Sequence, residues 1–187
     1  MRGRVRVAAV LALISLASPA LAITVRTLQS LYTAPTYHVS LVALLDAPPQ
    51  EVEAVLIDYA NYRSLDPRIR SSEVLSMPAP DLAVVHTRVR FCAAFFCRTI
   101  ERVENVEHHP GELVATVIPE RSQLKRGVTR TTWRAEGSGT LVTYDAELVP
   151  AFRVPDIIAR RYATRALRDS AENLFTNVER EANAAGR

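Results

Sequence analysis

The chain has 187 residues, 48% hydrophobic and 23% charged, which suits one domain with a buried core and argues against a two-domain enzyme or long disorder. Three of the 23 Lys and Arg residues, Arg2, Arg4 and Arg6, open the chain, and the remaining 20 balance the 20 Asp and Glu residues. A neutral remainder lacks the basic excess that phosphate contacts require, so nucleic acid is not an expected partner.

Residues 1–22 have the layout of a secretory signal peptide. The arginines precede the apolar run Val7–Leu16, and Ala20-Leu21-Ala22 fits the small-residue cleavage pattern. The sequence therefore predicts a mature protein that starts at Ile23 and is periplasmic or secreted. An uncleaved anchoring helix is the alternative, although the apolar run is shorter than the roughly 20 residues that a bilayer needs.

The mature chain is expected to consist of a short leader and one domain. Residues 23–36 show no clear period and form the leader, and the domain covers residues 37–187. Tyr37–Leu45 has the composition of a strand that stops before Pro48 and Pro49. Apolar residues at helical spacing follow, and predict one amphipathic helix and a further turn: Val52, Val55, Leu56, Tyr59 and Tyr62.

Six more strand-sized segments alternate with turn sequences. They are residues 69–76, 82–92, 97–107, 112–118, 128–136 and 140–148. Such short links favour antiparallel hairpins, so the sequence predicts seven antiparallel strands. A helix over residues 155–184 then closes the chain, and its apolar stripe runs from Ile158 and Tyr162 to Ala182. A helix of roughly 45 Å must cross the whole domain and cover one face of the sheet.

This order of elements resembles the helix-grip fold of the START-like (SRPBCC) superfamily. The segments that carry the resemblance are Ala47-Pro48-Pro49-Gln50-Glu51-Val52, Asp58-Tyr59-Ala60-Asn61-Tyr62, Gly127, Trp133, Gly139-Thr140-Leu141-Val142-Thr143-Tyr144, Pro150 and Val154-Pro155. Residues 37–184 look most like the polyketide cyclase/dehydrase and coenzyme Q-binding branch. The resemblance implies an α+β fold in which a curved seven-stranded sheet, two short helices after strand 1 and the C-terminal helix enclose a cavity for apolar molecules. Most familiar members of this branch work inside cells, so an export signal leaves the substrate open.

Cys92 and Cys97 are the only cysteines and are predicted to pair. An even count suits an exported chain, and a four-residue hairpin loop over residues 93–96 would set the two cysteines opposite each other. Two free buried thiols and a redox pair are the alternatives, although C-x4-C lacks the spacing of thioredoxin-like sites.

The same hairpin register turns two arginines toward the helix-covered face of the sheet. If Cys92 faces Cys97, then Val89 and Phe91 share a face with Arg98 and Arg102. We expect Arg102 to anchor the polar head of a ligand or to pair with an internal acid, and Arg98 to lie near the cavity mouth. A β-bulge near residues 95–96 would instead turn both arginines to solvent.

Aromatic residues fall on or beside the faces that meet under the long helix. They either pack the core or line the cavity, and with Val89, Arg98 and Arg102 they complete the candidate ligand-binding set. These aromatic residues are Tyr59, Tyr62, Phe91, Trp133, Tyr144, Phe152 and Tyr162.

No catalytic motif stands out in the sequence, which has no nucleophile elbow, no phosphate loop and no H-E-x-x-H. We therefore expect no cofactor and no metal site, and an exported protein that binds a hydrophobic small molecule such as a lipid, a quinone or a polyketide. A cyclase or dehydratase using the same cavity, and an interaction module with a filled cavity, are the alternatives. Four arginines of the last helix either form a solvated face or allow a transient membrane-surface contact: Arg160, Arg161, Arg165 and Arg168.

Overall fold

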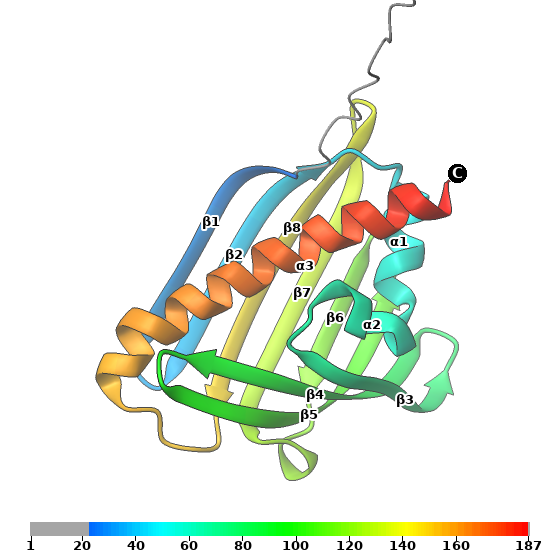
Figure 1. The fold of residues 1–187 in the computed structure, drawn as a ribbon. Helices are drawn as coiled ribbons and strands as arrows, with labels where there is room; N and C mark the ends of the chain where they lie inside the picture. Colours follow the sequence, from blue (N-terminus) through cyan, green and yellow to red (C-terminus); the bar gives the residue numbers. More distant parts are fainter. Residues whose placement is uncertain (1–22, 187) are drawn as a thin grey trace, which may run out of the picture.

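A computed structural model describes residues 23–186, which form one antiparallel sheet of eight strands with a long helix across one face (Figure 1). The strands are β1 (Thr24–Thr33), β2 (Thr36–Leu45), β3 (Ile69–Ala79), β4 (Leu82–Ala93), β5 (Phe96–His109), β6 (Glu112–Val117), β7 (Leu124–Glu136) and β8 (Gly139–Pro150). Their order in the sheet is β1-β2-β8-β7-β6-β5-β4-β3. The expected signal peptide, residues 1–22, lies outside the described residues.

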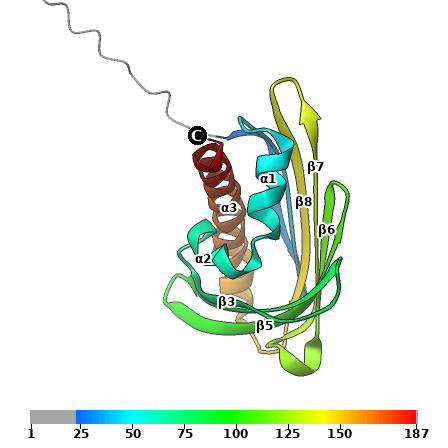
Figure 2. The same ribbon diagram turned by 90° about the vertical axis from the view of Figure 1, so that its right-hand side faces the viewer.

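The helices all lie on one side of the sheet (Figure 2). They are α1 (Pro49–Ile57), α2 (Tyr62–Leu65) and α3 (Thr164–Ala185), and single turns occur at Tyr59–Asn61 and Pro119–Arg121. A π-helical segment, η3 (Ile158–Ala163), leads directly into α3. The predicted long terminal helix and the two short helices after the first predicted strand are thus confirmed.

The prediction of seven strands was wrong by one, because part of the expected leader forms β1. This edge strand pairs along its length with β2, but its register shifts between Val25 and Thr27. A bulge of this kind breaks the alternation of inward and outward side chains, so the sequence shows no period of two. β1 also has only one neighbouring strand and buries its side chains incompletely.

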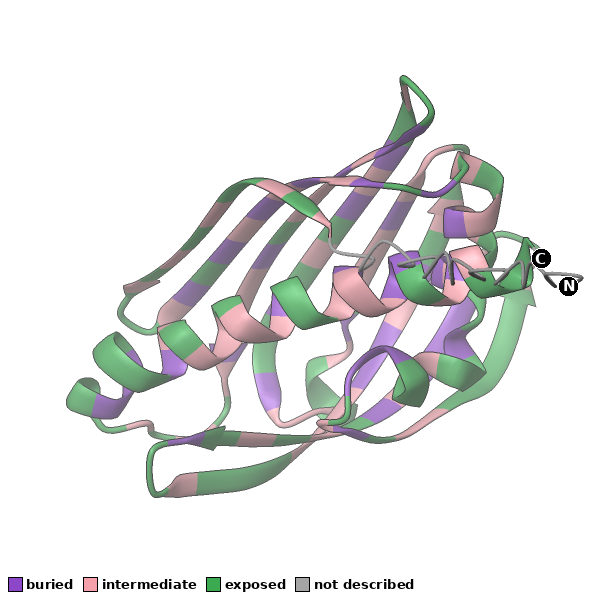
Figure 3. Cartoon of the chain, turned by 45° about the horizontal axis from the view of Figure 1, so that its top comes forward, coloured by how far each residue is buried: buried purple, intermediate pink, exposed green. Residues whose placement is uncertain are grey.

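The core lies between the concave face of the sheet and α3. Leu41, Ala43 and Leu45 alternate along β2 and are fully buried, as are Phe175 and Val178 of α3. The alternation is visible in Figure 3 as buried and exposed bands along the strands. Burying each large apolar side chain stabilises the fold by about 1.5–3 kcal/mol, so this layer holds helix and sheet together.

The π-helical segment corrects the predicted apolar stripe of the last helix. Ile158, Ala159 and Ala163 are buried, whereas Tyr162 is exposed. A regular α-helix would bring Tyr162 under Ile158, but the wider π turn moves the inward position one residue further, to Ala163. The candidate cavity residue Tyr162 therefore faces outward.

The β4–β5 hairpin has the predicted register without a bulge. Cys92 pairs with Cys97, Phe91 with Arg98 and Thr87 with Arg102. Cys92 and Cys97 form a disulfide, with their Cα atoms 4.1 Å apart. The loop is shorter than expected: Ala93 and Phe96 still pair, so the turn consists of two residues, the first of which, Ala94, has a φ of 53°.

Within residues 23–186, no helix is long and apolar enough to cross a membrane.

Candidate functional site

Two adjoining chambers lie between α3 and the concave face of the sheet. The larger has a volume of about 160 Å³ and is walled by β4, β5, β8 and α3. The smaller, of about 110 Å³, lies toward α2, β6 and β7. Ile69, Arg102, Tyr144 and Leu174 line both chambers. The chambers are therefore neighbouring parts of one cavity, and these four side chains stand where the two parts meet.

The walls are mainly apolar because each strand turns alternate residues inward. Val89 and Phe91 of β4 and Ile100 of β5, which is opposite Val89, line one side of the larger chamber, and Leu167 and Leu174 of α3 line the other. These positions follow the hairpin register, since residues at intervals of two share one face of a strand. An apolar surround of this kind favours apolar molecules and makes any charge inside it costly.

Arg102 and Glu104 put an ion pair into this apolar surround. Nε of Arg102 lies 2.9 Å from Oε2 of Glu104 and donates to Oγ1 of Thr87 at 3.3 Å. The Glu104 side chain is only 5% exposed, and its Oε1 has no hydrogen-bond partner among the described residues. Burial raises the pKa of Glu104, while Arg102 opposes that rise.

Two tyrosines flank this ion pair. Tyr62 donates from its hydroxyl to the carbonyl oxygen of Leu56 at 2.6 Å, and Tyr144 stands edge-on to Phe175 with ring centres 5.5 Å apart. Burial raises the pKa of both phenols, and the nearby Glu104 raises them further while Arg102 lowers them. Both hydroxyls therefore stay protonated at neutral pH and are able to donate.

The structure brings five of the ten candidate ligand-binding residues to the chamber walls. Val89 and Phe91 line the larger chamber, Tyr62 lines the smaller, and Arg102 and Tyr144 line both. Contact between these residues and a ligand stays a prediction, but their common location agrees with the register argument for the β4–β5 hairpin.

The other five candidates lie away from the chamber walls. Tyr59 is buried in the core, and Trp133 is buried where its indole nitrogen donates to Glu53 of α1 at 3.3 Å. The guanidinium carbon of Arg98 lies 4.3 Å from the ring centre of Phe152, at the exposed end of the hairpin. Neither these residues nor Tyr162 line either chamber.

Sequence reasoning missed Glu104 and a set of inward-facing threonines. Glu104 stands two residues after Arg102 on β5, so the alternation that turned Arg102 inward also applies to Glu104. A charged residue on a concave strand face was therefore the available signal. The threonines are Thr87, Thr129 and Thr131, which line the smaller chamber.

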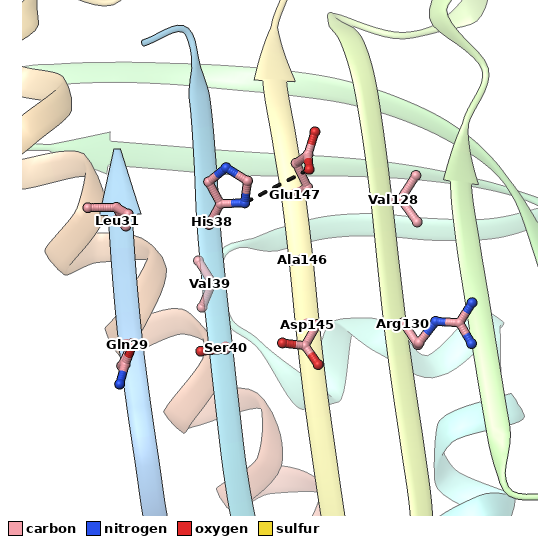
Figure 4. Close-up of a pocket in the computed structure, with 10 residues that line it drawn as sticks. All are labelled: Gln29, Leu31, His38, Val39, Ser40, Val128, Arg130, Asp145, Ala146 and Glu147. Carbon is pink, nitrogen blue, oxygen red and sulfur yellow. Dashed lines mark ion pairs between the residues drawn. The ribbon is translucent and has the colours of Figure 1, made fainter. Parts of the chain in front are cut away.

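A second hollow lies on the opposite, convex face of the sheet, where β1, β2, β8 and β7 run side by side (Figure 4). It has a volume of about 430 Å³ and is open to solvent, because no helix or loop of the described residues covers it. His38 and Glu147 lie 3.9 Å apart there, and Arg130 is paired with Glu112. Because this hollow lies open on the outer face of the sheet, whereas the chambers lie between the sheet and α3, the cavity under α3 is the better candidate site.

Comparison with protein families links most of the chain, from β2 into α3, to a known group. Residues 36–179 match the family model described as polyketide cyclase / dehydrase and lipid transport. A search of curated proteins found no relative with significant sequence similarity.

Solved structures with low sequence identity share the fold. TTHA0849 from Thermus thermophilus has 16% identity and a TM-score of 0.69, over 80% of this chain and 99% of that one. The STAR-related lipid transfer protein from Xanthomonas axonopodis has 14% identity and a TM-score of 0.65, over 83% and 98%. The Zhui aromatase/cyclase from a Streptomyces species (R1128) has 18% identity and a TM-score of 0.62, over 81% and 96%. The eight-stranded sheet with its long helix is therefore a START-like, helix-grip architecture.

Proposed function

Because this chain belongs to the polyketide cyclase/dehydrase and lipid transport family, we propose that it is an exported binding protein that holds a small hydrophobic molecule between the sheet and α3. The family description includes both chemistry and transport, so the site itself has to distinguish them. The apolar walls and the absence of a catalytic motif in the sequence support holding the molecule rather than transforming it.

The observation that supports this proposal most directly is the Arg102–Glu104 ion pair in the apolar cavity. Oε1 of Glu104 is buried without a partner in the described part of the chain, and an unsatisfied buried acceptor costs about 1–3 kcal/mol. A hydroxyl group on a bound molecule would satisfy this oxygen and recover that free energy. The preferred ligand is therefore apolar with one hydrogen-bond donor.

The size of the chambers sets a second limit on the ligand. About 160 Å³ and about 110 Å³ are each below the usual range of about 300 to 1,000 Å³ for drug-sized ligands. A compact ring molecule of quinone or polyketide type therefore suits the cavity better than a long-chain lipid does.

A matched pair of ring compounds tests the proposal. 2-Naphthol and naphthalene differ by one hydroxyl group, so their affinities, measured by calorimetry or by ligand-observed NMR, report on the polar anchor. We expect 2-naphthol to bind at least about tenfold more tightly, since a hydrogen bond to a charged group contributes about 1.5–3 kcal/mol. Equal affinities for 2-naphthol and naphthalene would contradict the proposal that the Arg102–Glu104 pair anchors a ligand hydroxyl. Failure of both compounds to bind the folded protein would favour the interaction module with a filled cavity.

A double variant and its control test whether the preference for 2-naphthol over naphthalene depends on Arg102 and Glu104. Arg102→Met with Glu104→Leu replaces the ion pair by apolar side chains, an exchange that often leaves stability unchanged or raised. This variant should still bind naphthalene but lose the preference for 2-naphthol. Arg88 and Glu101 form a cross-strand ion pair on the convex face of the same hairpin, in which Nε of Arg88 donates to Oε1 of Glu101 at 2.8 Å. Arg88→Met with Glu101→Leu should keep the preference.

One observation favours a second function, that of a cyclase or dehydratase. Glu104 has a raised pKa through burial and faces the smaller chamber, as a general acid or base would. A linear β-polyketone incubated with the protein would then lose one molecule of water on ring closure, as detected by mass spectrometry. Water loss that disappears in Glu104→Gln would establish the enzyme, whereas an unchanged mass agrees with binding alone.

A further inference from the structure

Three chain reversals meet at one end of the molecule, where β1–β2, β4–β5 and the β8–η3 connection come together (lower left in Figure 1). Tyr32, Ala93 and Ile158, one from each of these regions, pack in a single apolar cluster that is separate from the main core. This end is thus a continuous surface rather than three independent loops.

Large apolar side chains project from this end into solvent. Phe95 at the tip of the β4–β5 hairpin is 89% exposed, and Ile157 at the start of the last helix is 69% exposed. Tyr162, which the π-helical segment turns outward, is 38% exposed. The disulfide between Cys92 and Cys97 closes the hairpin whose tip carries Phe95.

Exposed arginines occur in the same segments of the chain as these apolar side chains. Arg98, Arg153, Arg160, Arg161 and Arg165 are all exposed, and none forms an ion pair within residues 23–186. Three of them lie over aromatic rings instead: Arg98 over Phe152 at 4.3 Å, Arg160 over Tyr32 at 5.6 Å and Arg161 over Tyr162 at 5.9 Å.

The acidic groups nearby are few. Asp156 stands beside Ile157 at the start of the last helix, and Asp169 follows one turn after Arg165. Elsewhere on the surface, by contrast, several arginines pair with glutamates of the sheet, such as Arg26 with Glu136 and Arg126 with Glu147. This end therefore carries five exposed arginines without an ion pair in the described part of the chain, with Asp156 and Asp169 as their acidic neighbours in the sequence.

We propose that this end docks on an anionic lipid surface, with Phe95 and Ile157 entering the interface and the arginines contacting lipid phosphates. Exposed apolar side chains next to exposed cations are the combination that such interfaces attract. Nucleic acid and acidic proteins would meet the arginines but would leave Ile157 exposed to water. The proposal goes beyond ligand binding and does not depend on it.

The larger chamber adjoins the proposed docking end. Phe91 and Leu167 line that chamber and also pack against the cluster of Tyr32, Ala93 and Ile158. A molecule leaving the chamber past these two side chains would enter the lipid without crossing bulk water.

Vesicle flotation tests the proposal on the purified chain, with the same N-terminus in every variant. We expect binding to vesicles of phosphatidylcholine with about one-third phosphatidylglycerol, and binding that weakens as salt is added. Vesicles of phosphatidylcholine alone should bind at least about tenfold less protein. Equal binding to both vesicles, or no binding to either, would overturn the proposal.

Two variants and one control locate the surface. Phe95→Ser with Ile157→Ser removes the apolar contacts, and Arg160→Gln with Arg161→Gln removes two cations, so each should lower vesicle affinity by about tenfold or more. Met77→Ser is the control, because Met77 is 63% exposed on β3, away from this end. Equal loss in all three variants would overturn the proposal, as would tight retention on duplex DNA that exceeds retention on anionic vesicles. Each variant should still discriminate 2-naphthol from naphthalene, which separates this test from that of the ligand cavity.

Discussion

Tyr37 carries a buried hydroxyl that the fold does not use. The residue is only 4% exposed, its ring lies 4.7 Å from that of Tyr32, and its oxygen has no hydrogen-bond partner in the described part of the chain. Burial, with smaller contributions from Tyr32 and Asp156, raises the pKa of this phenol from 10.0 to about 12. The folded protein therefore retains the Tyr37 proton at pH values where the unfolded chain has already lost it.

This shift predicts an alkaline loss of stability. Between pH 10.0 and about 12 the folded state binds more protons than the unfolded state, so the free energy of unfolding falls as pH rises. Tyr37→Phe should remove up to about 2 kcal/mol of that fall. At neutral pH the variant should be as stable as the unsubstituted protein or up to about 1 kcal/mol more stable, because an unsatisfied hydroxyl is lost.

Urea denaturation at neutral pH and at several alkaline pH values measures both effects. Tyr162→Phe, which alters an exposed ring, is the control and should leave the alkaline profile unchanged. A Tyr37→Phe profile that follows the unsubstituted protein at every pH would contradict the assigned burial of this hydroxyl.

At the scale of the element, the close approach of β8 to β2 requires glycine at the start of β8. A Cβ atom on Gly139 would lie 2.3 Å from the carbonyl oxygen of Leu45, which is backbone and has little freedom to move. The adjoining Thr140 donates to the carbonyl oxygen of Ala47 at 2.6 Å, so the chain around residues 45–47 is tied to β8. Gly139, the first residue of one of the segments that resemble the START-like superfamily, therefore has a packing role.

Gly139→Ala should lower the free energy of unfolding by about 2 kcal/mol or more, because the added methyl group forces two strands apart. Gly137, two residues earlier, has a φ of +62° but open space around it. Gly137→Ala should lower the free energy of unfolding by only about 1 kcal/mol, because backbone strain is its only effect. Thermal or urea denaturation compares the two variants, and equal losses would show that the contact with Leu45 relaxes at little cost.

At the scale of the whole molecule, the disulfide and the predicted export signal can be tested together on the native protein. If residues 1–22 direct export, N-terminal sequencing of the native protein should begin at or within a few residues of Ile23. Thiol labelling of the same material, denatured without reductant, should find no free cysteine, since oxidising compartments preserve disulfides. Intact Met1 in a cytoplasmic fraction would overturn export, and two labelled thiols would show that the Cys92–Cys97 disulfide does not form in the cell.

The sequence by itself determined the succession of strands along the chain from β2 onward, the long terminal helix, and the register of the β4–β5 hairpin. These features rest on local physics: alternation of side chains along a strand, helical spacing, and short links between neighbouring strands. Cys92 opposite Cys97 and Arg102 on the concave face follow from that register alone. The family resemblance added the expectation of a cavity, which local pattern does not contain.

Only the tertiary structure decided which inward-facing residues line the cavity and which fill the core. Trp133 and Tyr144 both lie on inner strands, yet Trp133 is covered by α1 while Tyr144 borders both chambers. The bulge in β1 and the π-helical turn that moves Tyr162 outward could not be predicted from local patterns, for the same reason. Each depends on where a helix or a neighbouring strand comes to rest, and that position is set by the packing of the whole layer.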